Sequence, residues 1–529
     1  MQRRDFLKAS AAAGAGILGA PHLAASQGQR VLRFAPQADL AILDPITTTG
    51  FVTRNHAFLV FDTLYGWDEQ YRAQPQMVDA HAVEDDGRTW TMTLREGLRF
   101  HDGEPVRARD VVASLKRWGR RDQFGLALMA VVEEVTATSD RVLRWRLKQP
   151  FPLLPDALAK VGANVAFIMP ERLANTDAAQ PISEMVGSGP YRFVAAERVA
   201  GSRNVYARFE GYVPRAQGTA SLLAGPKLAH FDRVEWLTIP DASTAAAALQ
   251  RGEIDWWEQP TVDLLPVLRR GRGLKIETLD PTGAIGMLRF NHLHPPFDNV
   301  GIRRAVLGAV SQADVMTAVA GTDRALWQDG VGFFAPGSIM ASDEGMQALT
   351  GPRDLAASRR ALEEAGYKGE KVLLMAPTDF PAINAMSEVV GDVFRRLGMN
   401  LDYAAMDWGS ALTRQANREP VERGGYSAFC TYTAGINQFN PAAHNFIRGS
   451  GLTATFGWST SPRLEELRNE WLQSADDETR RRVGRDMQRQ AFADVPYVPL
   501  GQFYQPTAYR EDLSGVLKGL ALFWNVRRG

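Results

Sequence analysis

Residues 80–118 read AHAVEDDGRTWTMTLREGLRFHDGEPVRARDVVASLKRW, and this stretch decides the fold. Its TWTMTL segment alternates polar and apolar side chains, which predicts a strand over residues 88–94 with one buried face. The run HDGEP at residues 101–105 is rich in turn-forming residues, so a turn should follow the strand. Apolar residues then recur at helical spacing, which predicts an amphipathic helix over residues 108–118. The stretch therefore lies at the centre of a small α+β unit.

The flanking segments extend this unit on both sides. We expect a strand at residues 31–34 and a helix at 53–65 before it. After it, strands at 131–138 and 141–147 are expected to form a hairpin about Ser139-Asp140. From Gly187 the character of the chain changes, because short strands dominate. These strands are expected at 191–195, 205–209 and 234–239, before a helix that Asp241 can cap and a strand that starts at Gly252.

A third unit begins near Asn291 and alternates between helices and strands. The expected elements are helices at 302–319, 354–365 and 382–397 and strands at 371–375 and 400–404. This alternation favours a mixed sheet covered by helices. The tail from residue 498 is again strand-like, and we expect it to return to an earlier sheet.

The first 26 residues have the pattern of a signal peptide. Their uncharged run at 9–20 is too short for the roughly 20 residues that anchor a helix in a bilayer. The run RRDFLK at 3–8 is similar to a twin-arginine export motif, and an ordinary secretory leader is the alternative. No cysteine near the leader can accept a lipid. We therefore expect cleavage near residue 25 or 26 and a periplasmic protein that is not a lipoprotein.

The composition is that of a globular protein with several domains. At about 150 residues per domain, 529 residues make three or so domain-sized units. Hydrophobic residues make up 45% and charged residues 23%, which excludes a fibrous or broadly disordered chain. Lys+Arg and Asp+Glu both number 60, so no long-range field of one sign exists to hold nucleic acid or an anionic membrane.

The sequence contains few candidates for catalysis or metal binding. His292 and His294 come nearest to a metal pair, but no acidic or thiolate partner lies near them in sequence, so we interpret them as loop residues. His101-Asp102 could be a base with its orienting carboxylate, although the turn is the better interpretation. Cys430 is the only cysteine, and it is more typical of a small apolar packing residue than of a nucleophile. We expect no cofactor and no metal.

The 80–118 stretch resembles the signature segment of the family 5 extracellular solute-binding proteins, the peptide-, dipeptide- and nickel-binding class that serves ABC importers. Further matches are GSGPY at 187–191, LQRGEID at 249–255 and IRRA at 302–305. The resemblance covers essentially everything after the leader. The chain departs from the family at 107–110, where RARD replaces a TAED-like run at a helix start.

The resemblance implies an α/β, two-lobed periplasmic binding protein fold of type II, with mixed sheets covered by helices and a hinged ligand cleft. Residues 27–55, 186–285 and 496–529 would form the first lobe, and 56–185 would be its extra α+β subdomain. The second lobe would comprise 286–495. Two crossovers between the lobes would supply the hinge.

The resemblance also implies which residues line the cleft. They would come from the loop after the first strand, from a tryptophan on the second lobe, and from a later strand with its loop. In this chain those positions are Thr49, Gly50, Phe51, Trp408, Phe429, Cys430, Thr431, Tyr432, Thr433 and Asn437. For Phe429 and Trp408, packing in the core is the alternative.

The implied function is capture of a small solute and its delivery to an inner-membrane ABC permease, by a monomer without covalent chemistry. A secreted hydrolase is the rival hypothesis, and a sensory or chaperone-like protein that uses the same cleft is a third. Peptide-binding members commonly carry an aspartate for the peptide amine in the second-lobe loop, whereas residues 429–440 contain no acidic residue. Thr49 stands where some oligopeptide binders carry a glutamate. We therefore expect a solute without a free amine, or one whose cation meets aromatic faces such as that of Tyr432.

Overall fold

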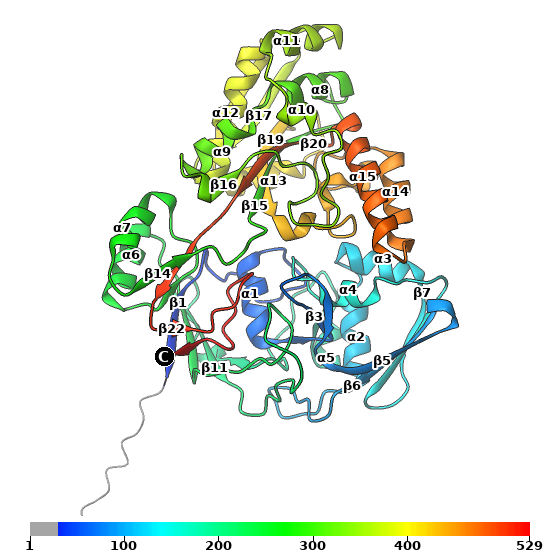
Figure 1. Ribbon diagram of the computed structural model, residues 1–529, viewed down its shortest axis with the longest axis vertical. Helices are drawn as coiled ribbons and strands as arrows, with labels where there is room; N and C mark the ends of the chain where they lie inside the picture. Colours follow the sequence, from blue (N-terminus) through cyan, green and yellow to red (C-terminus); the bar gives the residue numbers. More distant parts are fainter. Residues whose placement is uncertain (1–29) are drawn as a thin grey trace, which may run out of the picture.

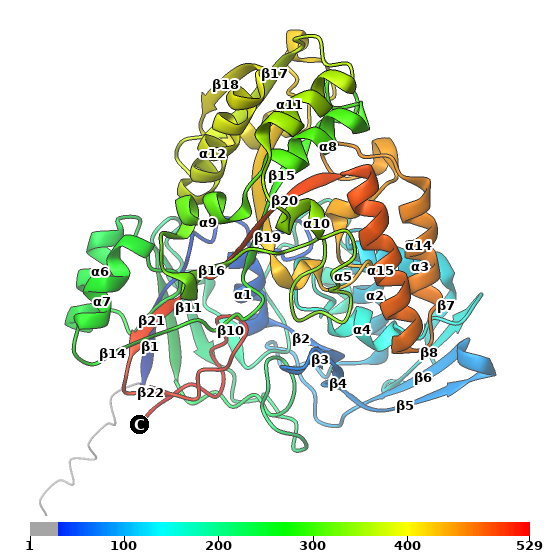
Figure 2. The same cartoon turned by 45° about the horizontal axis from the view of Figure 1, so that its top comes forward.

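The computed structural model describes residues 30–529 and folds them into two lobes (Figure 1). The expected signal peptide at 1–26 lies outside the described residues. The lower lobe contains the first half of the described chain and the last part of the red C-terminal segment, and the upper lobe contains the residues between them, including the red strand Tyr497–Phe503 (Figures 1 and 2). The chain therefore passes from the lower lobe to the upper lobe and back again.

The first lobe is built on a seven-stranded mixed sheet of order β10-β11-β12-β1-β13-β21-β14. Strand β1 lies at its centre, parallel to β12 and β13, and the other pairs are antiparallel. The strands are β1 (Val31–Ala35), β10 (Tyr191–Phe193), β11 (Arg203–Arg208), β12 (Arg233–Leu237), β13 (Trp256–Trp257), β14 (Leu274–Glu277) and β21 (Thr507–Arg510). The position of β21 confirms that the tail returns to an earlier sheet.

The core of this lobe is aromatic. The ring of Phe34 lies 5.3 Å from those of Trp236 and Trp256 and 4.9 Å from that of Phe523. Phe523 belongs to the C-terminal tail, so packing of the tail completes the core. Such aromatic contacts add about 0.5–1.5 kcal/mol each beyond the area that they bury.

Three helices flank the sheet of the first lobe: α1 (Phe51–Val60), α6 (Ala242–Arg251) and α7 (Leu265–Arg270). As expected, Asp241 caps α6, because its Oδ1 accepts a hydrogen bond of 2.7 Å from the Thr244 N–H. Helix α1 ends at Val60 rather than at residue 65. The next residues form β2 (Asp62–Thr63), which pairs with β9 (Phe167–Ile168), so a tertiary pairing ends the helix.

The extra subdomain contains a four-stranded antiparallel sheet of order β5-β6-β8-β7. Its elements are β3 (Tyr65–Trp67), β4 (Ala73–Pro75), β5 (Val78–Glu84), β6 (Thr89–Leu94), α2 (Ala108–Trp118), α3 (Gln123–Val131), β7 (Val132–Ala137), β8 (Val142–Leu147), α4 (Leu154–Ala159) and α5 (Glu171–Ala174). The strand, turn and helix predicted within 80–118 are confirmed. In the turn, Asp102 Oδ1 accepts a hydrogen bond of 3.1 Å from the Glu104 N–H.

The second lobe has a six-stranded mixed sheet of order β16-β20-β15-β19-β17-β18. Its strands are β15 (Ala284–Phe290), β16 (Trp327–Gln328), β17 (Lys371–Pro377), β18 (Asn400–Met406), β19 (Ala428–Ala434) and β20 (Tyr497–Phe503). Its helices are α8 (Val300–Ala309), α9 (Gln312–Ala320), α10 (Gln347–Thr350), α11 (Leu355–Glu364), α12 (Pro381–Leu397), α13 (Trp408–Gln415), α14 (Pro462–Gln473) and α15 (Asp477–Asp494). The single helix expected at 302–319 is divided into α8 and α9, because Ser311 leaves the helical path and caps α9.

The lobes are joined by two crossovers, as expected: residues 278–283 between β14 and β15, and residues 504–506 between β20 and β21. They lie side by side, since Ala284 pairs with Phe503 and a Cβ on Gly283 would lie 2.6 Å from the Phe503 carbonyl oxygen. The family resemblance implied that residues 496–503 belong to the first lobe. In the structure, β20 hydrogen-bonds between β15 and β16 of the second lobe, so the return crossover begins only after Phe503.

Candidate functional site

A cleft of about 1500 Å³ separates the two lobes. Its walls come from the first lobe and its subdomain, from the second lobe, and from the crossover that follows β20. Nine of the ten residues expected to line a cleft do so: Thr49, Gly50, Phe51, Trp408, Phe429, Thr431, Tyr432, Thr433 and Asn437. Cys430 is the exception.

The first-lobe wall is the loop that leads into α1, and buried polar contacts hold it rigid. The Asn164 Nδ2 donates hydrogen bonds to the carbonyl oxygens of Pro45, Ile46 and Thr48, at 3.0–3.1 Å. At the start of the loop, the Asp44 carboxylate pairs with the Arg117 guanidinium of α2 at 2.8 Å, and both side chains are buried. The subdomain thus fixes the loop that presents Thr49, Gly50 and Phe51.

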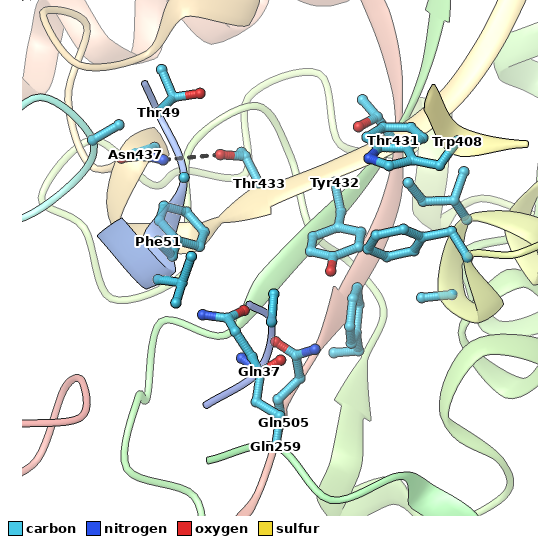
Figure 3. A pocket seen from close by; sticks show the side chains of 18 of the residues that line it. Gln37, Thr49, Phe51, Gln259, Trp408, Thr431, Tyr432, Thr433, Asn437 and Gln505 are labelled. Atoms are coloured by element: carbon cyan, nitrogen blue, oxygen red, sulfur yellow. Dashed lines mark hydrogen bonds between the residues drawn. The ribbon is translucent and has the colours of Figure 1, made fainter. Parts of the chain in front are cut away.

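The second-lobe wall is aromatic. The ring of Phe380 lies 5.3 Å from that of Trp408 and 6.0 Å from that of Tyr432, and Phe503 lies 5.2 Å beyond Tyr432. Trp408 is the first residue of α13, and its backbone N–H donates to Asp379 Oδ1 at 2.8 Å. It is half-buried, so part of the indole is available to a solute (Figure 3).

Strand β19 presents alternate side chains to different surroundings. Phe429, Thr431 and Thr433 face the cleft, although Phe429 is only 3% exposed and also packs against Tyr426. Cys430 points the other way, beneath α12, where burial raises the pKa of its thiol to about 12.

Tyr432 lies on the same face of β19 as Cys430, yet it reaches the cleft. Helix α12 begins only at Pro381, next to Phe380, and its first turn does not cover Tyr432. The expectation that Cys430 lines the cleft therefore fails for a local reason: α12 covers Cys430 and leaves Tyr432 open.

Asn437 lines the cleft and also forms a contact between the lobes. Its Nδ2 donates to Thr433 Oγ1 at 3.0 Å (Figure 3), and its Oδ1 lies so near Gly162 of the subdomain that a Cβ on Gly162 would be only 2.1 Å from it. Other contacts between the lobes include a hydrogen bond of 3.0 Å from Arg448 to Gln123, the ion pair Arg269–Asp323 at 3.6 Å and the rings of Tyr71 and Phe439, whose centres lie 4.3 Å apart. The lobes therefore touch at both ends of the cleft.

Three glutamines that the sequence reasoning missed gather on the cleft floor: Gln37, Gln259 and Gln505 (Figure 3). Gln37 follows β1, Gln259 follows the parallel strand β13, and Gln505 lies in the second crossover. Ligands of open α/β sheets bind beyond the carboxyl ends of the strands, and this rule could have identified Gln37 and Gln259. Side-chain amides both donate and accept hydrogen bonds, as peptide groups do.

Few charges line the cleft. Asp122 is buried and already engaged, because it caps α3 through the Gly125 N–H and forms an ion pair with Lys160. Arg121 and Asp263 are exposed at the rim. Within residues 30–529, no group of three His, Cys, Asp or Glu side chains is arranged to hold a metal ion. His292 and His294 each contact a backbone carbonyl, those of Pro496 and Arg418.

Two lobes with mixed sheets, two adjacent crossovers and a cleft between them define a type II periplasmic solute-binding protein. The model of the bacterial extracellular solute-binding proteins, family 5, matches residues 72–454, and that of the twin-arginine translocation signal matches residues 1–20. The chain belongs to family 5 of the bacterial extracellular solute-binding proteins, and its signal directs it to the periplasm. No helix within the part described, 30–529, is both long and apolar enough to cross a membrane.

Relatives match over nearly the whole chain. A protein of Sinorhizobium fredii named "Probable peptide ABC transporter periplasmic-binding protein y4tO" is 35% identical and covers 100% of this chain and 99% of its own. The glutathione-binding protein GsiB of Pectobacterium atrosepticum is 25% identical, with 89% of this chain and 88% of its own covered. The structure of the periplasmic binding protein AgaA of A. tumefaciens R10 with agropinic acid has a TM-score of 0.78 at 19% identity, and covers 94% of this chain and 99% of its own. This last similarity shows the fold.

Proposed function

We propose that this protein captures a peptide-class solute in the cleft, closes its lobes around it and delivers it to the permease of an ABC importer. The observation that carries the proposal is the cleft of about 1500 Å³ beside two crossovers. Its volume exceeds the roughly 300–1,000 Å³ of ordinary small-molecule pockets, so it has room for a solute of several residues. Closure about the crossovers would bury such a solute between the lobes.

The lining supports a peptide-class solute. Gln37, Gln259 and Gln505 can hydrogen-bond to peptide groups whatever the side chains, and the aromatic wall of Phe380, Trp408 and Tyr432 offers contact area for side chains. The names of the Sinorhizobium fredii and Pectobacterium atrosepticum relatives, which refer to a peptide and to glutathione, point the same way.

The proposal includes no covalent chemistry. A hydrolase needs an activated nucleophile with a base near the substrate. Cys430 is sealed beneath α12, and burial holds the pKa of its thiol at about 12, so it supplies no thiolate at neutral pH. We further propose that the protein acts as a monomer and that its partner is the permease.

The test is to isolate the protein gently from the periplasm and to identify retained solutes by mass spectrometry. We expect an intact peptide-class compound, which then binds the emptied protein at one site by calorimetry. Incubation with excess protein should leave it unchanged. Failure of every retained solute and of a mixed peptide library to bind would reject the proposal, as would turnover that a single substitution abolishes.

A further inference from the structure

A chamber of about 100 Å³ opens from the floor of the cleft, towards the crossovers. It shares five lining residues with the cleft: Gln37, Phe51, Gln259, Tyr432 and Gln505. Figure 3 shows the three glutamines gathered below Phe51 and Tyr432, where the two spaces meet. The chamber is large enough for several water-sized groups, so it fits one end of a solute and not a whole peptide.

Arg54 brings an unpaired positive charge to the chamber. Its Nε and one terminal nitrogen donate to Asn55 Oδ1 at 3.2 and 3.0 Å, and its guanidinium lies 4.6 Å from the centre of the Phe51 ring. Within residues 30–529 it has no carboxylate within 4.0 Å. Burial lowers the pKa of Arg54 to about 10, which is still well above neutral pH. The guanidinium therefore stays charged and has donors to spare.

Asp280 brings a carboxylate with a free oxygen. It lies in the first crossover, and its Oδ1 accepts from the Thr282 N–H at 2.8 Å and from Thr282 Oγ1 at 2.6 Å. Its Oδ2 has no hydrogen-bond donor among the described residues. Burial raises the pKa of this carboxyl group, as expected for a negative charge that is removed from water.

The other acid of the chamber, Glu258, is already engaged. Its Oε2 accepts from the Gln37 backbone N–H at 2.8 Å, and its Oε1 accepts from Asn55 Nδ2 at 2.7 Å. Glu258 therefore anchors the wall, and Arg54 and Asp280 are the charged groups left to meet an occupant.

Arg54 and Asp280 thus line one small chamber with opposite charges that do not touch each other. Each of these two charged groups is partly removed from water without a direct counter-ion. This arrangement costs free energy until a group of the opposite charge binds beside each of them. The group that matches both at once carries an ammonium and a carboxylate close together. A standard peptide carries these charges at opposite ends, whereas a γ-glutamyl or other side-chain-linked residue carries both on one carbon.

We propose that the chamber binds the zwitterionic α-amino-acid end of the solute, with its carboxylate on Arg54 and its ammonium on Asp280. The proposal rests on the proposed function and narrows its solute class. It replaces the expectation of a solute without a free amine, because that expectation considered only the acid-free loop at 429–440 and Thr49, and not the chamber. An occupant would touch the first lobe at Arg54, the second lobe at Tyr432 and the hinge at Asp280, so its binding would favour the closed arrangement.

The test is calorimetric titration of the mature protein with glutathione, whose γ-glutamyl end is such a zwitterion. Two blocked forms are titrated beside it: one N-acetylated, the other with the γ-glutamyl α-carboxylate converted to an amide. We expect wild-type protein to bind glutathione, and either block to weaken binding by about thirtyfold or more, as loss of one partner from a buried charge pair does.

Three variants assign the contacts. Asp280→Asn keeps the acceptor for Thr282 and should no longer distinguish glutathione from its N-acetylated form. Arg54→Met should no longer distinguish glutathione from the amide, and Arg54→Lys should restore part of that selectivity. Asp79→Asn and Arg272→Met are matched controls, since both residues are exposed and neither lines the cleft or the chamber. Melting temperatures confirm that every variant is folded.

The proposal is overturned if glutathione does not bind, if the blocked forms bind equally well, or if the chamber variants keep wild-type selectivity. Its failure is distinguishable from failure of the proposed function. If retained solutes or library peptides bind while glutathione does not, the chamber is rejected and peptide capture stands. If no solute of any kind binds, the proposed function is rejected as well.

Discussion

Gly162 of the subdomain lies directly against Asn437 of the second lobe, and the contact between the lobes at this point requires that residue 162 has no side chain. A Cβ there would lie 2.1 Å from Asn437 Oδ1 and 3.3 Å from its Cγ. The φ of Gly162 is not positive, so alanine suits its backbone when the lobes are apart. We therefore predict that Gly162→Ala disfavours closure without destabilising either lobe.

The magnitude follows from what must move. Asn437 can swing aside only by giving up its 3.0 Å hydrogen bond to Thr433, a loss of about 1 kcal/mol. If the backbone moves instead, overpacking costs up to about 3 kcal/mol. Closure is coupled to solute binding, so affinity should fall by about 5- to 150-fold.

The assay is calorimetry with the retained solute in a double-mutant cycle with Asn437→Ala. Gly162→Ala should weaken binding strongly when Asn437 is present and little when it is replaced. Small-angle scattering at saturating solute should show a less compact Gly162→Ala protein. Equal losses in both backgrounds, or unchanged affinity of the single variant, would refute the reasoning.

Three other predictions concern the aromatic wall, the half-buried acid Glu258 and export. Trp408→Ala should reduce solute affinity by about 2 kcal/mol, roughly thirtyfold, at a nearly unchanged Tm; constant affinity with a lower Tm would make Trp408 a packing residue. Burial raises the pKa of Glu258 from 4.5 to about 7 despite Arg54 nearby, so the folded state holds its proton more tightly than the unfolded state. The tighter binding of this proton by Glu258 stabilises the folded state fully below about pH 4.5, and the stabilisation is lost as pH rises to about 7. The Tm of Glu258→Gln relative to wild type should therefore increase over this range, and a pH-independent difference would contradict the shift. Replacing Arg3 and Arg4 together by lysine should leave precursor in the cytoplasm, detected by fractionation; normal export would contradict twin-arginine transport.

The sequence alone determined most of the local elements and the family. The strand, turn and helix within 80–118 formed as expected, with α2 spanning the predicted residues, because alternation, turn chemistry and helical spacing act between near neighbours. Nine of the residues that the resemblance implied do line the cleft. A resemblance transfers the position of a residue along the chain but not the contacts that its side chain makes. It failed at Cys430, where the outcome depends on where α12 begins.

Only the tertiary structure decided which distant residues meet. Strand β20 joins the second lobe because it pairs with β15, more than two hundred residues earlier, and no local pattern records that pairing. Gly162 and Asn437, and likewise Arg54 and Asp280, become neighbours only when the lobes and the crossovers are in place. The sequence determines the chemistry of each side chain. Packing between segments far apart in the chain determines whether a counter-charge or an empty space lies opposite it.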